Sequence, residues 1–504
     1  MQFQFPPRST RGAVLGFTWS QIALVMAGVI AAVVALNLLV ASQRGAAIAA
    51  FAGCVALITL GLLRFKGRRV TEWAPVVAGA LLQRRAGQHE YRGGPYAPDS
   101  SERWMDLPGP AAAYVWLPAT ATDGTTQIGL LHHRKEKTVT AALVCYGTNL
   151  ILADRDVQTQ RLTDWAQLLN ILGSEYADAG LIRWSVTSRA VPDTGNAAQR
   201  FLVSRAVDIS SAAYRSLAQL TAAAAPAAQR HEIYLAVVFD IARLSKEIAQ
   251  AGGTDAAIAA VVLDRLAGIE AAVGEAGVTT GGWLSPRAYA AVIRTQFDPD
   301  DQEVVDLRGS TAPISAGTAA GVEPRLAGPV AARTVGWNTY QHDSAYSRTL
   351  WVAQMPRQQV AATWLSPLYM RTTTRRAVTL VAQPVPAALA ALATRRDKVS
   401  RAGDEVTKRR LRLVRTARED DEARAVEQID REQAAGHVRY RYALLITITA
   451  RTLPELDRDV RAVKRILSRA GCEAISLAGE QDQAFAAGAL PLARGLKPAR
   501  GWSA

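Results

Sequence analysis

Two long apolar runs lie near the start of the chain. Phe17–Ala41 is interrupted only by isolated polar residues, and Ala46–Leu63 carries no charge. As α-helices these runs are about 37 and 27 Å long, so each can cross a hydrocarbon core of about 30 Å, the first with some tilt. The polar break at 42–45 fits a tight turn. The sequence therefore predicts a membrane anchor in residues 1–90, with transmembrane helices at about 17–41 and 46–63.

Basic residues flank both runs and predict their orientation. The residues expected to set the topology, with the tryptophan that opens the first span, are Arg8, Arg11, Trp19, Arg64, Lys66, Arg68 and Arg69. The turn between the spans carries Arg44 alone, so the positive-inside rule places both ends of the hairpin in the cytoplasm. A cleaved signal peptide is the alternative, but its apolar core would be shorter and no second span would follow. The basic stretch 64–92 either lies against anionic lipid or only fixes the topology, and we favour the second.

After the anchor, the hydrophobic pattern changes to that of an α+β protein. Alternating or continuous apolar runs predict strands at 128–133, 139–146 and 181–186, and helical spacing predicts helices at 162–176 and 196–223. Two later stretches follow one plan of strand, helix, strand and helix, about 205 residues apart. We therefore expect two related cytosolic α+β modules, residues 91–305 and 336–495.

Capping signals support the helices of both stretches. In the first, strand 233–239 precedes an apolar stripe at 258–273, and Ser285-Pro286 opens the next helix as an N-cap with proline at the first helical position. In the second, strand 438–449 precedes a capping box made by Thr452 and Glu455. The stripe that follows ends near Gly471, and a strand is expected to return at 472–477.

Two segments of the soluble part have biased compositions. Residues 306–335 include the Gly-, Ala-, Pro-, Ser- and Thr-rich stretch 309–330, which predicts a linker. Residues 386–435 are dense in charges of both signs, which predicts either one long solvated helix or a helical hairpin. Gly403 is the most favourable place for a break.

The overall charge does not point to nucleic acid. The 504 residues contain 58 basic and 44 acidic residues, a net charge of +14, but seven of the basic residues precede the first acid, Glu72. In the charged segment the acidic residues cancel the field, so direct nucleic-acid binding is disfavoured. Cys54, Cys145 and Cys472 share no metal-ligand spacing, which indicates reduced thiols in a cytosol-facing protein.

No catalytic constellation emerges from the motifs. The sequence contains no GxxxxGK[ST], HExxH, CxxC or GxSxG. His132-His133 is expected to be an exposed strand end rather than a metal site. The FDPDD stretch at 297–301 resembles the start of a calcium loop, but Glu303 and Gly309 occupy the positions that need glycine and glutamate. We expect no cofactor, no metal, no small-molecule substrate and no enzymatic activity.

The first 90 residues resemble the PrgI family of two-span membrane proteins from Gram-positive conjugation systems. The resemblance is carried by Phe5-Pro6, by the GFTWSQ stretch at 16–21 and by Trp73 beyond the second span. It implies a membrane subunit of a transfer apparatus.

Residues 345–495 resemble the non-motor N-terminal part of TraC/TrbE-type conjugation ATPases. The matching pieces are Thr349–Val352 ending at Pro356, Gln383-Pro384 before the charged segment, and EQDQAF at 480–485 leading to LPL at 490–492. In that family this part packs near membrane proteins of a type IV secretion apparatus. The motor that follows in the family is absent here, so we expect no ATPase activity from this chain.

The middle of the chain, about 135–300, is similar to EccE, a membrane subunit of type VII secretion. Strand 233–239, the alanine-rich helix and Trp283–Pro286 followed by Tyr289 and Ile293 carry this similarity of pattern. The arginine and alanine usage suits an actinobacterial host. The preferred hypothesis is a membrane-anchored structural subunit of a conjugative, type IV-like machine that binds a separate motor ATPase and assembles in a complex. An EccE-like type VII component is the runner-up, and a membrane-tethered enzyme or nucleic-acid-binding protein is third.

Overall fold

The computed structural model describes residues 2–3, 19–65, 68–93, 105–121, 123–147, 152–192, 196–224, 229–308, 320–361, 363–370, 374–410 and 417–496. These residues form two compact units. One holds the first five residues, His89–Ala390 and Ala435–Ala504, and the other holds Pro6–Gln88 and Ala391–Ala434.

The second unit is helical. Its elements are α1 (Trp19–Val40), α2 (Arg44–Leu62), β2 (Arg64–Phe65), β3 (Arg68–Arg69), α3 (Val70–Arg85), most of α13 (Ala387–Arg410), and α14 (Ala417–Ala434). The charged segment is thus two helices rather than one. Gly403 does not break it: this residue lies inside α13, which continues to Arg410. Thr394 Oγ1 donates to Gln433 Oε1 at 2.8 Å and Lys398 pairs with Asp430, so α13 and α14 run antiparallel as a hairpin.

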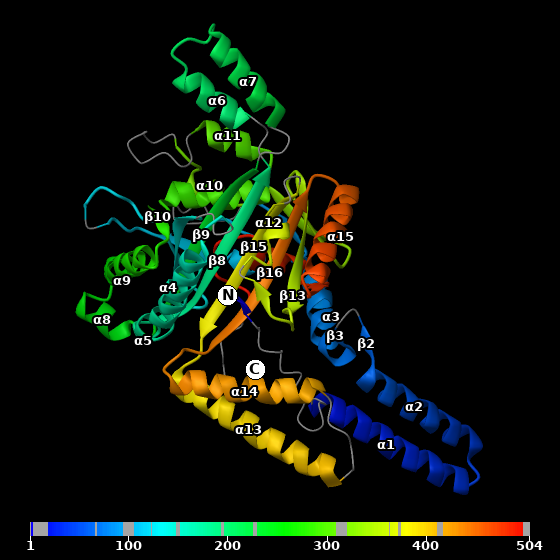
Figure 1. Cartoon of the computed structure of the whole chain (residues 1–504). Helices are drawn as coiled ribbons and strands as arrows, with labels where there is room; N and C mark the ends of the chain where they lie inside the picture. Colours follow the sequence, from blue (N-terminus) through cyan, green and yellow to red (C-terminus); the bar gives the residue numbers. More distant parts are fainter. Residues whose placement is uncertain are drawn as a thin grey trace. The chain divides into compact units, whose positions relative to one another are not determined.

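The first unit is built on a 13-stranded antiparallel sheet in the order β4-β11-β12-β13-β16-β15-β8-β9-β7-β6-β5, with β10 paired to β7 and β17 to β13 (Figure 1). Its strands are β4 (Glu90–Arg92), β5 (Tyr114–Leu117), β6 (Leu130–His133), β7 (Thr138–Tyr146), β8 (Leu181–Pro192), β9 (Gln229–Asp240), β10 (Thr279–Trp283), β11 (Ala331–Val335), β12 (Thr339–His342), β13 (Ala345–Gln354), β15 (Arg375–Pro384), β16 (Tyr440–Ala450) and β17 (Glu473–Ser476). A separate ribbon pairs β1 (Gln2–Phe3) with β14 (Val360–Ala361).

The helices of this unit connect and cover the strands. They are η2 (Gly109–Ala111), α4 (Arg155–Gly173), α5 (Glu175–Asp178), α6 (Asn196–Arg205), α7 (Ala212–Ala224), α8 (Ser245–Gln250), α9 (Asp255–Glu275), α10 (Pro286–Phe297), α11 (Asp301–Leu307), η5 (Pro324–Leu326), α12 (Ser366–Tyr369), α15 (Leu453–Arg469) and α16 (Gln481–Gly488). The chain is therefore a mixed α and β protein with an antiparallel sheet and two apolar N-terminal helices.

The same order of elements occurs twice in the chain. If the short elements α5, α8 and β14 are left aside, the first half runs η2-β5-β6-β7-α4-β8-α6-α7-β9-α9-β10-α10, and the second runs η5-β11-β12-β13-α12-β15-α13-α14-β16-α15-β17-α16. The short strands β10 and β17 both return to the third strand of their half. The last helices of the two orders also share a short pattern, because Ala288–Ala291 in α10 reads AYAA and Ala484–Ala487 in α16 reads AFAA.

The two halves meet along β8 and β15. These strands pair over seven positions, and Thr187 opposite Thr379 is the central pair. The segments 91–305 and 336–495 thus contribute strands to one sheet inside one compact unit. Residues 331–335, which the sequence assigns to the linker, form β11 between β4 and β12, because this short polar strand has no apolar run to reveal it. The central part of the expected linker, 309–319, lies outside the described residues.

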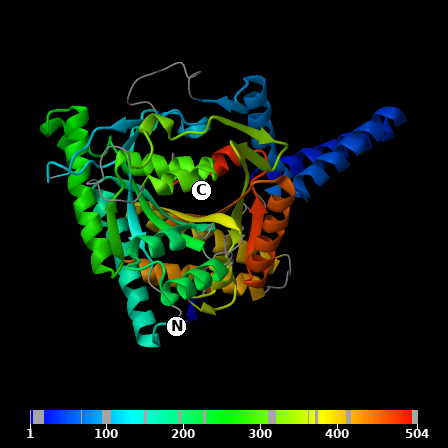
Figure 2. The same cartoon turned by 90° about the horizontal axis from the view of Figure 1, so that it is seen from above.

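Helices cover both faces of the sheet. One face carries α10 and α16, with the ring of Phe297, the last residue of α10, 5.0 Å from the ring of Phe485, and the sheet curves around these helices (Figure 2). On the other face, α4 and α9 cover the first half and α15 covers the second. Burial on both faces explains why strands such as β9 read as continuous apolar runs.

The local signals in the sequence are realised. Ser285 Oγ accepts from Ala288 N–H with Pro286 at the first position of α10, and Thr452 Oγ1 accepts from Glu455 N–H at the start of α15. Gly471, at φ +78°, follows α15. Each feature matches the expected cap.

Candidate functional site

The helical hairpin α1–α2 packs through small residues. Gln21 is 5% exposed and its Nε2 donates to Gly61 O at 2.8 Å. A Cβ on Gly28 would lie 2.7 Å from the Ile58 side chain, so glycine permits the close approach of the two helices. Small residues at the contact and a polar side chain bonded across it are features of helix pairs in lipid.

The outer surface of the hairpin is apolar. Large side chains of α1 and α2 that are about half exposed or more are Met26, Val29, Ile30, Val33, Val34, Leu36, Leu39, Val40, Ile48, Phe51, Val55, Leu60 and Leu62. Both helices are long and apolar enough to cross a membrane, with described spans Gln21–Val40 and Arg44–Leu62. Water would not stabilise this distribution, whereas a hydrocarbon phase would.

The residues predicted to set the topology are only partly placed. Arg8, Arg11 and Lys66 lie outside the described residues, and Trp19 is the first residue of α1. Arg64, Arg68 and Arg69 lie on the short ribbon β2–β3, in which Arg64 pairs with Arg69 directly after α2. The ribbon thus gathers these backbone positions at the end of the second apolar helix.

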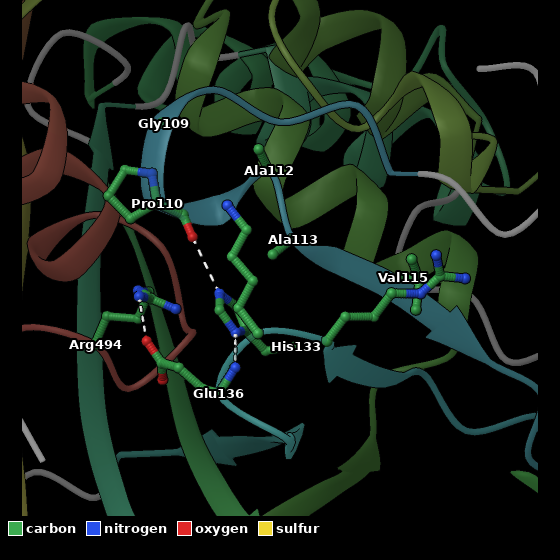
Figure 3. Close-up of a pocket in the computed structure, with 10 residues that line it drawn as sticks. Gly109, Pro110, Ala112, Ala113, Val115, His133, Glu136 and Arg494 are labelled. Atoms are coloured by element: carbon green, nitrogen blue, oxygen red, sulfur yellow. Dashed lines mark hydrogen bonds and ion pairs between the residues drawn. The ribbon is translucent and has the colours of Figure 1, made fainter. Parts of the chain in front are cut away.

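The first unit contains a cavity of about 500 Å³ beside the turn between β6 and β7 (Figure 3). Its lining includes Gly109, Pro110, Ala112 and Ala113. It also includes three polar residues labelled in the figure, His133, Glu136 and Arg494. Arg494 comes from the segment after α16, so the second half of the chain supplies one wall of a cavity in the first.

The carboxylate of Glu136 joins the two halves. It accepts from Arg183 Nη2 at 3.0 Å and from Arg494 Nη2 at 2.7 Å, and Arg183 Nη1 also donates to Leu496 O. Burial would raise the pKa of Glu136, but Arg494 and Arg183 outweigh it and hold that pKa below its ordinary value. The group is therefore an ionised bridge and not a proton donor at neutral pH.

His133 does not form the exposed strand end expected from the sequence. It is 3% exposed, because the turn folds back under η2. Its Nδ1 accepts from Glu136 N–H at 3.0 Å, which leaves the proton on Nε2 facing Pro110 O at 3.2 Å. Burial, helped by the charge of Arg494, lowers the pKa of His133, so the ring is neutral.

A second polar cluster lies around the C-terminal end of α10. Arg189 donates to Val292 O and Thr295 Oγ1, and Arg375 donates to Thr295 O and Gln302 Oε1. Cations at this end of a helix satisfy its last carbonyls. Burial lowers the pKa of Arg375 to about 9, with the nearby Arg189 adding to the effect.

The three aspartates of the calcium-like stretch bind arginines instead. Asp298 and Asp301 pair with Arg294 at 3.2 and 2.5 Å, and Asp300 pairs with Arg451. Each carboxylate of the stretch thus has a guanidinium partner. Within the part of the chain that the structure describes, no three His, Cys, Asp or Glu side chains are grouped as a metal site would need.

These clusters were missed at the level of sequence. Arg183 and Arg189 occur in β8, whose other residues are apolar or carry small hydroxyl side chains, and this is the one signal that could have marked them as buried. The partners of Glu136 are 47 and 358 residues away, beyond any local pattern. Both clusters bind one half of the chain to the other, which is a structural role.

Comparison with known proteins adds no assignment: neither a protein-family model nor a curated protein sequence matches this chain.

Proposed function

We propose that the protein is a membrane-anchored, non-catalytic scaffold subunit of a conjugative, type IV-like transfer machine, with a soluble body that binds a separate motor ATPase. The observation that carries the anchoring is the α1–α2 pair, which turns small residues inward and large apolar residues outward. Both ends of this hairpin face the cytoplasm in the proposal, since the flanking arginines favour that orientation.

The scaffold role agrees with how the soluble unit is built. Its buried charged groups connect the two halves of the sheet, as in the bridge from Glu136 to Arg183 and Arg494. The repeated order of elements favours an origin as two related modules. Their shared sheet provides a rigid body with two outer helical faces.

The second half offers a charged face for the motor. On α15, Arg461, Arg465 and Arg469 are exposed and four residues apart, so they form a stripe with steps of about 6 Å along the helix. The buried stripe of the same helix packs on β13 and β16. We propose this basic stripe as the surface that meets an acidic patch of the motor ATPase, because this half resembles the part of conjugation ATPases that precedes the motor.

A type VII role is the second candidate. The observation that favours it is the build of the middle region, where β9, α9, β10 and α10 follow the EccE-like pattern, including the Ser285 cap. The partners would then be core membrane subunits of that system.

The test is recovery of the tagged full chain from native membranes in mild detergent, with quantitative mass spectrometry of the partners. The proposal expects a conjugation motor ATPase, with recovery reduced about tenfold by Arg461→Glu. Arg155→Glu, an equally exposed charge reversal on α4, is the matched control and should leave recovery unchanged.

Three outcomes would contradict parts of the proposal. Type VII core subunits in place of the motor would promote the second candidate. Equal recovery of the motor by both variants would show that the α15 stripe is not the binding surface. A protein released from membranes by carbonate at high pH would remove the anchor.

A further inference from the structure

The hairpin α6–α7 has no core of its own. It projects from the ends of β8 and β9 (Figure 1). No residue of this hairpin whose burial the structure describes is buried, and Leu202, Tyr214 and Ala218 are half-buried. Ordering such a segment in water costs conformational entropy that little burial offsets.

Large apolar side chains instead face outward. Val207 and Ile209, on either side of Asp208 at the tip, are 104% and 63% exposed, and Phe201 and Leu220 are each 65% exposed. Leu217 is half exposed one turn before Leu220. Apolar groups gathered this densely on a protruding element mark a surface that something covers.

The charge of the hairpin is positive. Residues 196–224 contain three arginines, one aspartate and no lysine or glutamate, a net charge of +2. Arg205 lies over the ring of Phe201 at 5.6 Å, and Arg215 is exposed on α7. The single acid, Asp208, is occupied locally, because its Oδ1 accepts from the backbone N–H and the hydroxyl of Ser210.

We infer that the tip of α6–α7 inserts into the anionic surface of the membrane that holds the chain. A net positive element with exposed aliphatic and aromatic side chains is suited to the headgroup region. A second copy is a poorer occupant, because two such hairpins would bring like charges together. The inference rests on the anchoring proposed above, since a chain already tethered to a bilayer needs only a weak second contact with lipid.

The test uses the full chain in lipid nanodiscs with an environment-sensitive fluorophore at the tip. Val207→Cys supplies the labelling site, and the native cysteines Cys54, Cys145 and Cys472 are buried and react poorly. Leu152→Cys, at a position 83% exposed outside the hairpin, is the matched control. Discs of pure phosphatidylcholine are compared with discs that contain phosphatidylglycerol.

The inference expects a blue shift and quenching by nitroxide-labelled lipid for the label at position 207, in anionic discs only. The label at position 152 should not respond. Arg205→Glu and Arg215→Glu, both at exposed positions, should each weaken the lipid-dependent signal about fivefold.

Identical behaviour of the two labels would overturn the inference. So would a shift at position 207 that appears only when two copies share a disc, which would assign the surface to a second copy. Failure of the anchor is seen separately, as elution of the protein apart from the disc. In that case the same label, read with added anionic vesicles, still decides whether the hairpin binds lipid.

Discussion

Two helical hairpins have matching positions in the order of elements of the two halves, and they differ in almost every other respect. α6–α7 follows β8 with six large apolar side chains exposed between Phe201 and Leu220. α13–α14 follows β15 within a segment, 387–434, that contains 12 basic and 10 acidic residues. Its helices hold each other through polar contacts such as Lys398 with Asp430. The two hairpins thus have matching positions in the order of elements and very different surfaces, which makes them the places to look for function.

The largest expected effect tests whether the halves unfold together. Phe485 is 1% exposed and packs against Phe297 of the other half, so Phe485→Ala should lower the free energy of unfolding by about 3–5 kcal/mol. Denaturant unfolding in detergent, followed by tryptophan fluorescence and by circular dichroism, should shift as one transition. If the two probes report different midpoints, the halves unfold independently, and the two hairpins cannot be compared as parts of one cooperative body.

Removing the bridging charge should cost nearly as much. Glu136→Gln leaves Arg183, 4% exposed, and Arg494 without their anion, so we expect a loss of about 3 kcal/mol. Glu323→Gln, which breaks the exposed pair with Arg325, is the control and should change stability by less than about 0.5 kcal/mol. Because the pKa of Glu136 is depressed in the folded state, its contribution is present above the unfolded value of 4.5 and is lost as pH falls below it. If the difference in free energy of unfolding between wild type and Glu136→Gln did not change as pH falls below 4.5, the bridge would be contradicted.

A buried histidine of the second half should give a different pH dependence. His342 is fully buried, its ring nitrogens contact Phe297 O and Ser347 Oγ, and burial lowers its pKa to about 4. A folded pKa below the ordinary 6.5 means that stability is complete above pH 6.5 and decreases as pH falls towards 4, by up to about 3 kcal/mol. His342→Gln should remove this slope between pH 6.5 and 4. An unchanged slope in the variant would assign it to other groups.

The smallest expected effect on stability comes from a pair of substitutions that compares the two hairpins directly. Val207→Asp in α6–α7 and Val399→Asp in α13 both change exposed side chains, so each should alter stability by less than about 0.5 kcal/mol. Only Val207→Asp should abolish lipid quenching of a label at position 209. Equal loss with both variants would mean that the two hairpins are not functionally distinct.

Amphipathic elements could be predicted, whereas the centre of the sheet could not. The helix α15 and its cap could be predicted because the residues that determine them, from Thr452 to Leu467, lie a few positions apart. By contrast, β15 begins with Arg375 and Arg376 and ends with Pro384. Its arginines look like surface residues, although Arg376 is buried and Arg375 is half-buried. Arg375 donates to Thr295 O on α10, 80 residues away, and the strand position of Arg376 is opposite Ala190 of β8.

The same limit applied to the candidate site. Local pattern located the two apolar helices and their flanking arginines. The bridge around Glu136 and the exposed tip of α6–α7 depend on tertiary packing. Val207 and Ile209 look like core residues in the sequence, yet both are exposed in the structure. The prediction of a break at Gly403 was wrong because a solvated helix tolerates glycine at a cost of about 1 kcal/mol.

The pairing of β8 with β15 also has a consequence for folding during synthesis. After β8 leaves the ribosome, about 190 residues must follow before its partner exists, which takes about 10–40 s at typical rates of synthesis. Throughout that interval the nascent first half carries a long unpaired strand edge, which invites pairing with a second nascent chain. Chaperone dependence and polysome-level aggregation are thus expected costs of joining the two halves at their middle strands.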